Sequence, residues 1–348
     1  MPDEAHEETE RLLQDLEQRI TAEYRQAAEE LEEKCNDYFR RYRIKDQIKR
    51  QQLANGEITQ AEYDYWRTGQ ILIGERWKEM RDTLAEDLTH TNEIAAEMIN
   101  RELPQIYAIN HNYGTFEIER GSLLNTSYTL YSRETVERLI RDNPDLMPQA
   151  RIDIPKDERW NRQKIQSAIT QGVLQGESID KIASRLQRVT NMNRAAAIRN
   201  ARTMTTSAQN GGRINAYRRA EEMGIKTIKV WLATPDSRVR DSHARLDGEE
   251  RETEEEFSNG CRYPGDPNGD PAEVYNCRCT LISQVKGTPR IDVTDLSQRH
   301  SGLSRDYDGD EEMTYQDWKD YHSDDPDVRQ AARDKWKESE KGKERRKR

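Results

Sequence analysis

The sequence is poor in hydrophobic residues and has no long apolar run. Only 33% of its 348 residues are hydrophobic, whereas 35% are charged. No stretch approaches the roughly 18 consecutive apolar residues that a membrane-spanning helix requires. The first ten residues are acidic, whereas a secretory signal would begin with positive charge followed by an apolar segment. We therefore expect a cytoplasmic protein with long exposed helices or tails around one modest core.

Cysteine and net positive charge are scarce as well. Four cysteines in a cytoplasmic chain favour free thiols or metal ligands over a disulfide framework. The formal net charge of -10 gives no overall attraction to nucleic acid, so a DNA contact would need a local basic segment. Residues 341–348, KGKERRKR, are such a segment. They could neutralise a few DNA phosphates, or they could simply keep the end of the chain soluble.

Proline is missing between Pro2 and Pro104, so no proline interrupts a helix in this region. Apolar or small residues recur every three or four positions from 12 to 42 and form one stripe. This spacing predicts a long amphipathic helix. The Asn-Gly pair at 55–56 then interrupts the pattern.

A second helix is expected directly after this break. Thr59 and Glu62 have the spacing of a capping box, in which each side chain satisfies a free backbone donor of the first turn. Apolar residues at helical spacing continue from 73 to 98. We predict an antiparallel helical hairpin over residues 1–100. Because two helices cannot bury both of their faces, the hairpin must pack on the rest of the chain or on another subunit.

The composition changes between residues 107 and 147. Glycines and the Thr- and Tyr-rich segment 125–132 precede a short helical pattern at 134–140, and Pro144 and Pro148 follow it. This arrangement predicts an irregular or strand-containing start of a second domain.

Residues 160–223 return to a helical pattern, and Gly224 lies where that helix would end. Ile228, Val230 and Leu232 occupy alternate positions, as in a half-buried strand. Gly211 and Gly212 lie inside the helical pattern and lack the sequence of a phosphate-binding loop, so we expect a kink or a close helix contact there. Helices followed by short strands indicate an α+β domain.

The final sixty residues contain the acidic segment 305–312, a short helical pattern around 315–321 and the basic end. Low hydrophobicity with dense charge predicts a mostly disordered tail. The predicted fold class is therefore α+β and mainly α. We expect an amphipathic helical hairpin over 1–100, an α+β domain over 101–286 and a largely disordered charged tail over 287–348.

Residues 199–281 carry the most distinctive pattern of the chain. Its features are Arg202, Thr203, Asn210 and Arg213 in a helix, the strand ending in Trp231, the segment Asp236–Gly248, Phe257, the turn Pro264–Pro267 and the segment Asn276–Cys279. In their order and spacing, these features resemble the Mu F-like head-morphogenesis family of bacteriophages. The more divergent residues 115–198 fit the upstream part of the same domain.

The resemblance implies a minor head protein of a tailed bacteriophage. Such a protein would be built into the head interior or the portal region of the virion, during assembly in the host cytoplasm. Its expected partners are the portal protein, the major capsid protein or scaffold proteins, and it could associate with the packaged DNA. The resemblance implies no enzymatic activity, and we predict no catalytic or cofactor-binding residue.

Four residues of this region could bind a metal ion. Cys277 and Cys279 place two soft ligands close together. His243 and Cys261 could supply two more, which gives the three-cysteine, one-histidine set suited to tetrahedral zinc. Two cysteines separated by one residue are less usual than a wider pair, and Cys261 precedes a proline turn. The alternative is a group of small buried thiols with a hydrogen-bonded histidine.

A dense group of charged or ionisable residues follows the predicted strand. We expect ion pairs that fix the shape of this loop. The alternative makes Asp236 and His243 an acid–base pair, but neither a nucleophile nor a substrate group is apparent beside them. The group consists of Asp236, Arg238, Arg240, Asp241 and His243.

A second hypothesis also follows from the resemblance, because domains of this family are thought to be similar to the ADP-ribosyltransferase fold and occur in toxin-like proteins. Such an enzyme or toxin-type effector would use NAD. It would need an arginine or histidine for the nucleotide, a Ser-Thr-Ser-like strand and a glutamate that stabilises the ribosyl cation. Arg120, residues 125–127 and either Glu254 or Glu256 match these roles only loosely.

Overall fold

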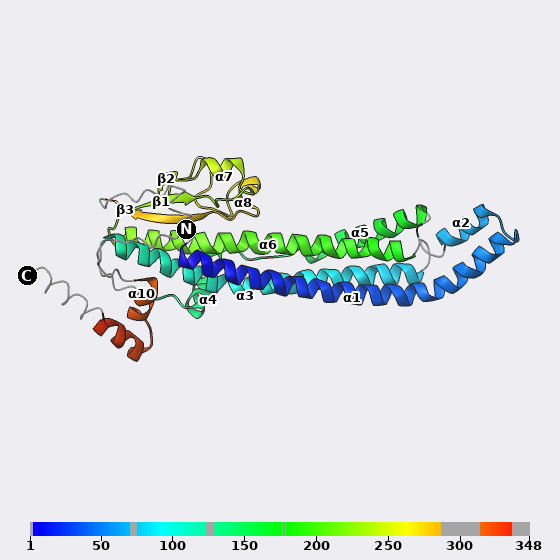
Figure 1. Cartoon of the computed structure of the whole chain (residues 1–348), viewed down its shortest axis with the longest axis horizontal. Coiled ribbons are helices and arrows are strands. Elements are labelled where there is room, and N and C mark those ends of the chain that lie inside the picture. The colour runs from blue at the N-terminus through cyan, green and yellow to red at the C-terminus, as the bar shows by residue number, and fades with distance from the viewer. Residues whose placement is uncertain are drawn as a thin grey trace, which may run out of the picture. The chain divides into compact units, whose positions relative to one another are not determined.

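The computed structural model describes residues 3–69, 75–122, 129–175, 177, 179–286 and 314–335 (Figure 1). Helices dominate these residues and one small antiparallel sheet is present, so the predicted α+β, mainly α class is confirmed. The helices are α1 Glu4–Ala54, α2 Gln60–Thr68, α3 Glu75–Ser122, α4 Arg133–Asp142, the 3-10 helix η2 Pro144–Leu146, α5 Ile154–Leu174, α6 Ile179–Glu222, α7 Asp241–Arg245, α8 Pro271–Val274 and α10 Tyr315–Tyr321. The strands are β1 Thr227–Leu232, β2 Glu250–Glu252 and β3 Thr280–Val285.

Some of the sequence predictions concern residues outside this described set. They are the apolar position 73, residues 125–127 of the NAD hypothesis, the acidic segment 305–312 and the basic end 341–348. Among the described helices, none is both long enough and apolar enough to cross a membrane.

The chain forms two compact units, and both are discontinuous in sequence. The first, here called the sheet unit, takes residues up to Gln14, then Arg101–Gln149 and the residues from Asn200 onward. The second, here called the helical unit, takes Asp15–Asn100 and Ala150–Arg199. Helices α1, α3 and α6 therefore contribute residues to both units. The consecutive division at residues 100 and 286 remains a prediction.

The helical unit contains the long helix and the capping box that the sequence predicts. Helix α1 has no break before Ala54. Helix α2 begins after Thr59, whose hydroxyl accepts the Glu62 backbone N–H at 3.3 Å, while the Glu62 carboxylate accepts the Thr59 N–H at 2.8 Å. The capping box is therefore confirmed. The second helix of the expected hairpin is described as two segments, α2 and α3.

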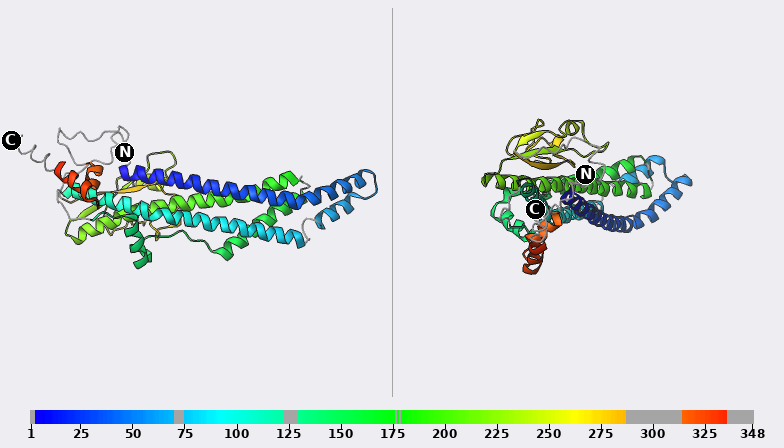
Figure 2. Two further views of the ribbon diagram at one scale, coloured as in Figure 1. Left: turned by 90° about the horizontal axis from the view of Figure 1, so that it is seen from below. Right: turned by 60° about the vertical axis from the view of Figure 1, so that its left-hand side comes forward.

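Polar side chains link four helices of the helical unit. In this unit α1, α3, α5 and α6 run side by side (Figure 2) around an apolar core that includes the fully buried Trp77. The Tyr24 hydroxyl of α1 donates to the Asn92 amide of α3 at 2.5 Å. Asn92 donates to Asn193 of α6 at 2.9 Å, and Asn193 donates to Asn161 of α5 at 2.9 Å. Because each side chain comes from a different helix, this network fixes the register of all four.

Helix α3 corrects one expectation. The sequence suggested an irregular or strand-containing segment from residue 107, but α3 continues through Pro104 to Ser122. A proline inside a helix costs about 3 kcal/mol, because it removes a backbone donor and crowds the preceding turn. Leu103, Ile106 and Tyr107 on either side of it are buried, and this packing offsets the cost. The short helix expected at 134–140 is confirmed as α4.

The two glycines in α6 mark a close approach to α3. A Cβ atom on Gly212 would lie 2.5 Å from the carbonyl oxygen of Tyr107 and 3.0 Å from the backbone nitrogen of His111. Only a residue without a side chain fits there. Of the two alternatives that the sequence allowed, the close helix contact is therefore the one observed.

A three-stranded antiparallel sheet of order β2-β1-β3 lies along α6 within the sheet unit (Figures 1 and 2). The central strand β1 is the one predicted at 228–232, and its Val230 pairs with Ile282 of β3. Gly224 ends the preceding helix with a φ of 87°, a left-handed conformation that glycine adopts without strain. Strand and helix end are thus both confirmed.

The short helix expected at 315–321 is confirmed as α10. Tyr315 and Trp318 of α10 are buried against Tyr113 and Phe116 of α3. The Trp318 indole donates to the Glu119 carboxylate at 2.5 Å. This part of the expected tail is therefore folded onto the sheet unit. Residues 287–313 and 336–348 lie outside the described residues.

Candidate metal centre

Buried polar side chains of α6 hold the segment that carries two of the cysteines. The hydroxyl of Thr203 accepts the backbone N–H of Asn276 at 3.0 Å. The hydroxyl of Thr206 donates to the carbonyl of Cys277 at 2.6 Å. Thr203 and Thr206 are three residues apart and so face the same side of the helix. Asn276 has a φ of 59°, in the left-handed region that asparagine tolerates better than most residues.

Asn210 continues this polar face by one further turn. Its side-chain oxygen accepts the backbone N–H of Leu281 at 3.0 Å, and its amide donates to the carbonyl of Cys279 at 3.2 Å. The backbone on both sides of Cys277 and Cys279 is therefore bonded to α6. This explains physically why the threonine and asparagine positions accompany the Asn-Cys-Arg-Cys segment in the sequence pattern.

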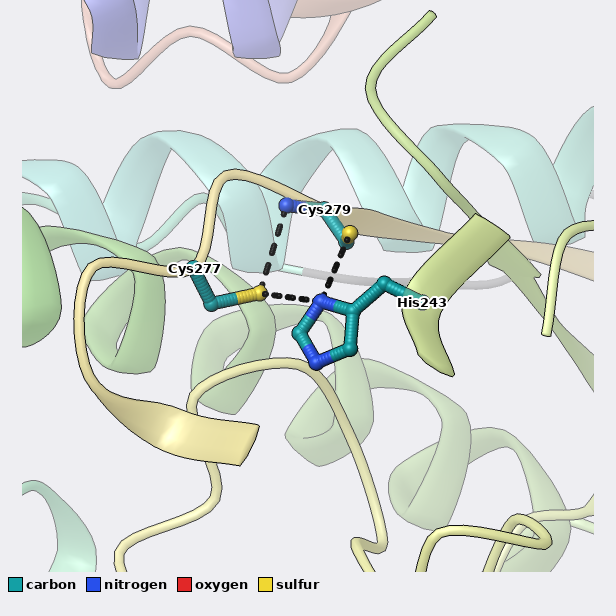
Figure 3. A group of neighbouring side chains, drawn as sticks. All are labelled: His243, Cys277 and Cys279. Atoms are coloured by element: carbon teal, nitrogen blue, oxygen red, sulfur yellow. Dashed lines mark hydrogen bonds between the residues drawn. The ribbon is translucent and has the colours of Figure 1, made fainter. Parts of the chain in front are cut away.

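His243 lies on the short helix α7 and faces the two cysteines (Figure 3). Its Nδ1 atom is 3.6 Å from Sγ of Cys277 and 3.4 Å from Sγ of Cys279. All three residues are buried, and one ligand atom from each lies within 4.8 Å of the other two. The structure thus brings together three of the four residues that the sequence nominated.

Aromatic rings form an apolar wall beside this group. The indole of Trp231 contacts the His243 ring edge-on at a centroid distance of 5.3 Å, and Phe257 contacts Trp231 in the same way at 5.1 Å. Both aromatic residues are buried. The rings restrict water access and fix the orientation of the imidazole.

Cys261 is buried in the same apolar cluster but is not part of the three-residue group. Its sulfur lies against the backbone of Gly269, where a Cβ atom would be only 2.5 Å away. Burial raises the pKa of the Cys261 thiol to about 12, and nearby carboxylates add to the effect. In this structure Cys261 is a neutral buried thiol that fills space.

The two grouped cysteines share a hydrogen bond, which separates their pKa values. The bond from Cys277 lowers the pKa of the Cys279 thiol well below its usual value, and the adjacent His243 lowers it further. The same bond and burial raise the pKa of Cys277. Cys279 is therefore the sulfur that gives up its proton first, and a thiolate is the form in which cysteine binds metals.

The second ring nitrogen of His243 faces a carboxylate. Nε2 lies 3.0 Å from Oε2 of Glu273 on α8. The length is that of a hydrogen bond, but the approach is bent away from the direction of a well-aligned one. The amide of Asn259 donates to the same oxygen at 3.3 Å.

Two sulfurs and one imidazole nitrogen in a buried site suit an ion of intermediate softness. The described group of His243, Cys277 and Cys279 could therefore hold a metal ion. Cys35, the remaining cysteine, is buried in the core of the helical unit and is free.

The charged loop before α7 is held mainly by Arg278, which lies between the two cysteines. Arg278 donates to both oxygens of Asp236, at 2.5 and 2.8 Å. Within the loop, the Arg238 backbone N–H donates to Asp236 at 2.9 Å, whereas the Arg238 guanidinium approaches only to 3.5 Å. The Arg278 contacts hold the pKa of Asp236 well below its usual range. Arg240 donates to the backbone carbonyl of Tyr275. The sequence placed the ion pairs within the loop, because residues distant in sequence gave no signal of contact.

The residues proposed for catalysis have other partners. Asp236 is bonded to Arg278, and His243 faces the cysteines and Glu273, so the two do not act as one acid–base unit. Glu254 is held by Arg218 through contacts of 2.5 and 3.0 Å. The other residues of the NAD hypothesis are Arg120, which lies over the ring of Phe116, Glu256, which is exposed, and 125–127, outside the described residues.

Two contributors near the centre were not anticipated from the sequence. Glu273 gave no signal, since a single glutamate in a glutamate-rich chain is unremarkable by itself. Lys229 is fully buried, and its ammonium group donates to the backbone carbonyls of Thr253 at 2.9 Å and Arg262 at 2.7 Å. In the sequence, a lysine between the apolar residues of the predicted strand was the signal that the face of the sheet carrying Lys229 is also covered.

Comparison with known proteins identifies the region that contains this centre. Residues 163–282 match the family model described as Phage Mu protein F like protein. The minor head protein GP7 of Bacillus phage SPP1 is 22% identical over 285 residues, which cover 79% of this chain and 84% of GP7. His243, Cys277 and Cys279 all lie inside the Mu F-like match.

Two further relatives match shorter segments. The NAD(+)–arginine ADP-ribosyltransferase EFV of Enterococcus faecalis is 35% identical over 127 residues, 36% of this chain and 26% of the enzyme. An uncharacterized protein of Haemophilus influenzae is 30% identical over 154 residues, 41% of this chain and 31% of that protein. The chain therefore spans only about a quarter to a third of the length of these two relatives. No solved structure matches.

The predicted resemblance is confirmed: residues 163–282 are Mu F-like, and most of the chain is similar to a phage minor head protein.

Proposed function

We propose that this chain is a minor head protein that acts in the assembly of a tailed-phage head. The observation that carries the proposal is the match with the minor head protein GP7, which extends over most of both chains and well beyond the Mu F-like residues 163–282. A role in assembly fits the highly charged helices of the chain, which leave long surfaces for contact with other subunits. The virion head or portal region is the proposed location, reached from the host cytoplasm during assembly.

The proposed partners are the portal protein, the major capsid protein and scaffold proteins. A direct test is to co-express the full chain with each of these proteins of its own phage, one at a time, and to measure complexes by size-exclusion chromatography with light scattering. We expect a stable complex with at least one of them. If none of the three shifts the mass of the chain at micromolar concentrations, the proposal of direct head assembly contacts is wrong.

DNA contact is proposed only for the basic end of the chain, residues 341–348. Cationic residues that neutralise phosphates release counterions, so affinity should fall steeply with salt. Fluorescence anisotropy of a labelled duplex, with the full chain and with a chain lacking residues 338–348, separates the alternatives. Binding that survives this deletion would contradict a role of the basic end.

We propose that the metal held by His243, Cys277 and Cys279 is zinc with a structural role. Zinc prefers this combination of thiolate and imidazole ligands and has no redox chemistry of its own in proteins. Elemental mass spectrometry of protein purified under reducing conditions should find about one zinc ion per chain. The double variant Cys277→Ser/Cys279→Ser should lose it. A well-folded wild-type protein without metal would overturn this part of the proposal.

The second candidate function is NAD-dependent ADP-ribosyl transfer, favoured by the match with the enterococcal enzyme. We rank it below head assembly, because the match covers only 26% of that enzyme and Glu254 is already bonded to Arg218. Calorimetric titration of the full chain with NAD tests it. We expect no binding at millimolar NAD; binding that depends on Glu254 or Glu256 would reverse the ranking.

A further inference from the structure

The metal proposal does not explain the surroundings of Nε2, the ring nitrogen of His243 that faces away from the cysteines. Nε2 is buried, and the carboxylate of Glu273 lies 3.0 Å from it. Both sulfurs lie on the opposite side of the ring, next to Nδ1. The imidazole therefore lies between the two thiols, which Nδ1 faces, and the Glu273 carboxylate, which Nε2 faces.

The chemistry of imidazole assigns different roles to the two nitrogens. A histidine binds a metal ion through an unprotonated nitrogen, and its other nitrogen then carries the proton. A metal ion next to Cys277 and Cys279 would take Nδ1, which leaves Nε2 as an N–H donor. A buried donor without an acceptor costs on the order of a lost hydrogen bond. Glu273 is the acceptor that the structure supplies at this position.

We infer that Glu273 is a positioning residue of the metal centre, accepting the Nε2 proton of His243 and thereby presenting Nδ1 to the ion. This inference rests on the proposed metal site. A carboxylate behind a histidine ligand fixes the protonated nitrogen, holds the ring orientation and makes the ligand nitrogen more basic.

The local structure around Glu273 supports this role, because it fixes the carboxylate independently of His243. The side chain of Asp270 accepts the Ala272 N–H at 2.8 Å and caps the short turn of α8. The backbone N–H of Glu273 donates to the Asp270 carbonyl at 2.8 Å. The Asn259 amide also donates to the Glu273 oxygen that faces His243. A carboxylate anchored at both its backbone and its side chain is preorganised to receive the histidine proton.

Charge also favours this arrangement. Two thiolates and a divalent cation form a neutral centre, so Glu273 contributes the negative charge that faces the imidazole. Glu273 keeps 20% of its side chain exposed, whereas His243 is buried. The Glu273 carboxylate is thus partly exposed and also contacts a buried ring.

The test compares zinc affinities by competition with a chromogenic chelator, using the full chain. Glu273→Gln keeps the shape and removes the charge, and Glu256→Gln is the control, since Glu256 is an exposed carboxylate of the same region. We expect Glu273→Gln to weaken zinc binding by about 10- to 100-fold while about one ion per chain still binds at saturation. The control variant should stay within about twofold of the wild type, because its side chain does not support a ligand.

A second measurement separates a metal-linked role from a packing role. Unfolding midpoints of wild type and Glu273→Gln are compared with zinc bound and with zinc removed by chelation. We expect a difference between the two chains with zinc and little difference without it. Long-range proton–nitrogen spectra of zinc-loaded wild type should show the His243 proton on Nε2.

Three outcomes would overturn the inference in distinguishable ways. Unchanged zinc affinity in Glu273→Gln, with zinc lost in Cys277→Ser, would reject Glu273 and leave the metal site standing. An equal loss of stability with and without zinc would assign Glu273 a packing role only. A folded wild-type protein that binds no zinc would reject the metal proposal and this inference together.

Discussion

Arg213 is a fully buried charge whose partners come from three distant parts of the chain. Its guanidinium donates to the Asp3 carboxylate at 2.7 Å, to the Asn110 side chain at 3.0 Å and to the Leu281 carbonyl at 2.6 Å. The ring of Tyr113 lies 5.1 Å from its central carbon. Burial alone would raise the pKa of Asp3, but Arg213 outweighs this effect and lowers it. One arginine thus joins α3, α6, β3 and the first residues of the chain.

Removing the counter-charge of Arg213 should be costly. We expect Asp3→Asn to lower the free energy of unfolding by about 3 kcal/mol, because the guanidinium stays buried without its nearest carboxylate. Urea unfolding followed by tryptophan fluorescence measures this change. Asp15→Asn is the control, since the Asp15 side chain is 64% exposed and pairs with Arg19 one helical turn away. Equal stability of the two variants would contradict the central role of this pair.

Single residues also show what sequence reasoning could reach at the metal centre. The cysteine pair and His243 were nominated because their side-chain types bind metals. Cys261 was nominated for the same reason, but its sulfur lies against Gly269, which only three-dimensional packing reveals. Glu273 was not nominated because carboxylates are common in this chain and its function depends entirely on its distance to His243.

The contact of α3 with α6 depends on one glycine. Gly212→Ala would place a Cβ atom 2.5 Å from a backbone oxygen of Tyr107, and backbone cannot move aside cheaply. We expect a loss of about 1–3 kcal/mol in the free energy of unfolding, in spite of the better helix propensity of alanine. Thermal and urea unfolding both report it.

Gly211→Ala is the matched control for this prediction. Its Cβ atom would meet the Tyr107 ring at 3.6 Å, an ordinary contact. The variant should be neutral or up to about 1 kcal/mol more stable, because alanine favours the helix. Similar effects at both positions would show that helix propensity, not the close approach, controls this site.

Two buried ionisable groups on α3 give opposite dependences on pH. Burial lowers the pKa of His111 to about 3, so its contribution to stability is present above the usual histidine pKa of about 6.5 and is lost as pH falls toward 3. Burial raises the pKa of Glu117 to about 7, so its contribution is present below 4.5 and is lost as pH rises through 7. Between pH 4.5 and 6.5 the opposite effects of the two groups on the pH dependence of stability largely cancel.

Glu117→Gln should expose this cancellation. Glutamine cannot ionise, so the unfolding free energy of the variant relative to wild type should rise by roughly 2–3 kcal/mol between pH 4.5 and 7. Urea unfolding at several pH values measures the difference. Glu97→Gln, at an exposed position of α3, should give a curve parallel to that of the wild type. A parallel curve for Glu117→Gln as well would refute the raised pKa.

At the level of elements, local signals were reliable and long-range effects were not. The Thr59 capping box, the left-handed Gly224 and the strand 228–232 depend on neighbouring residues, and all are confirmed. The continuation of α3 through Pro104 depends on burial against distant helices, which overrides the local cost of proline. A single sequence does not show which distant segment will supply that burial.

At the level of the whole molecule, the N-terminal residues belong to the sheet unit. Thr9 accepts a hydrogen bond from Asn110 at 2.8 Å, and His6 lies 2.8 Å from the side-chain amide of Gln209. The hydrophobic pattern predicted the long helix from residue 12, whereas α1 begins at Glu4 and so includes both residues. Their partners lie about a hundred or two hundred residues away. The sequence therefore predicted the helix, but not that its first residues belong to the sheet unit.

The isolated segment 101–286 should fold poorly as a consequence. It lacks Asp3, His6 and Thr9, so Arg213 loses its carboxylate partner and Asn110 loses its bond to Thr9. We expect a urea midpoint well below that of a fragment spanning 1–286, or no cooperative transition. Equal midpoints would show that the expected domain 101–286 is an independent folding unit after all.

The central proposal is that this chain, with its Mu F-like residues 163–282, is a component of a phage head. The most direct measurement is quantitative mass spectrometry of heads purified after co-expression of the chain with the portal, scaffold and major capsid proteins of its own phage. The account predicts that the chain co-purifies with the heads, in far fewer copies than the major capsid protein. Heads that assemble without it, while the soluble chain remains abundant in the same lysate, would contradict the account.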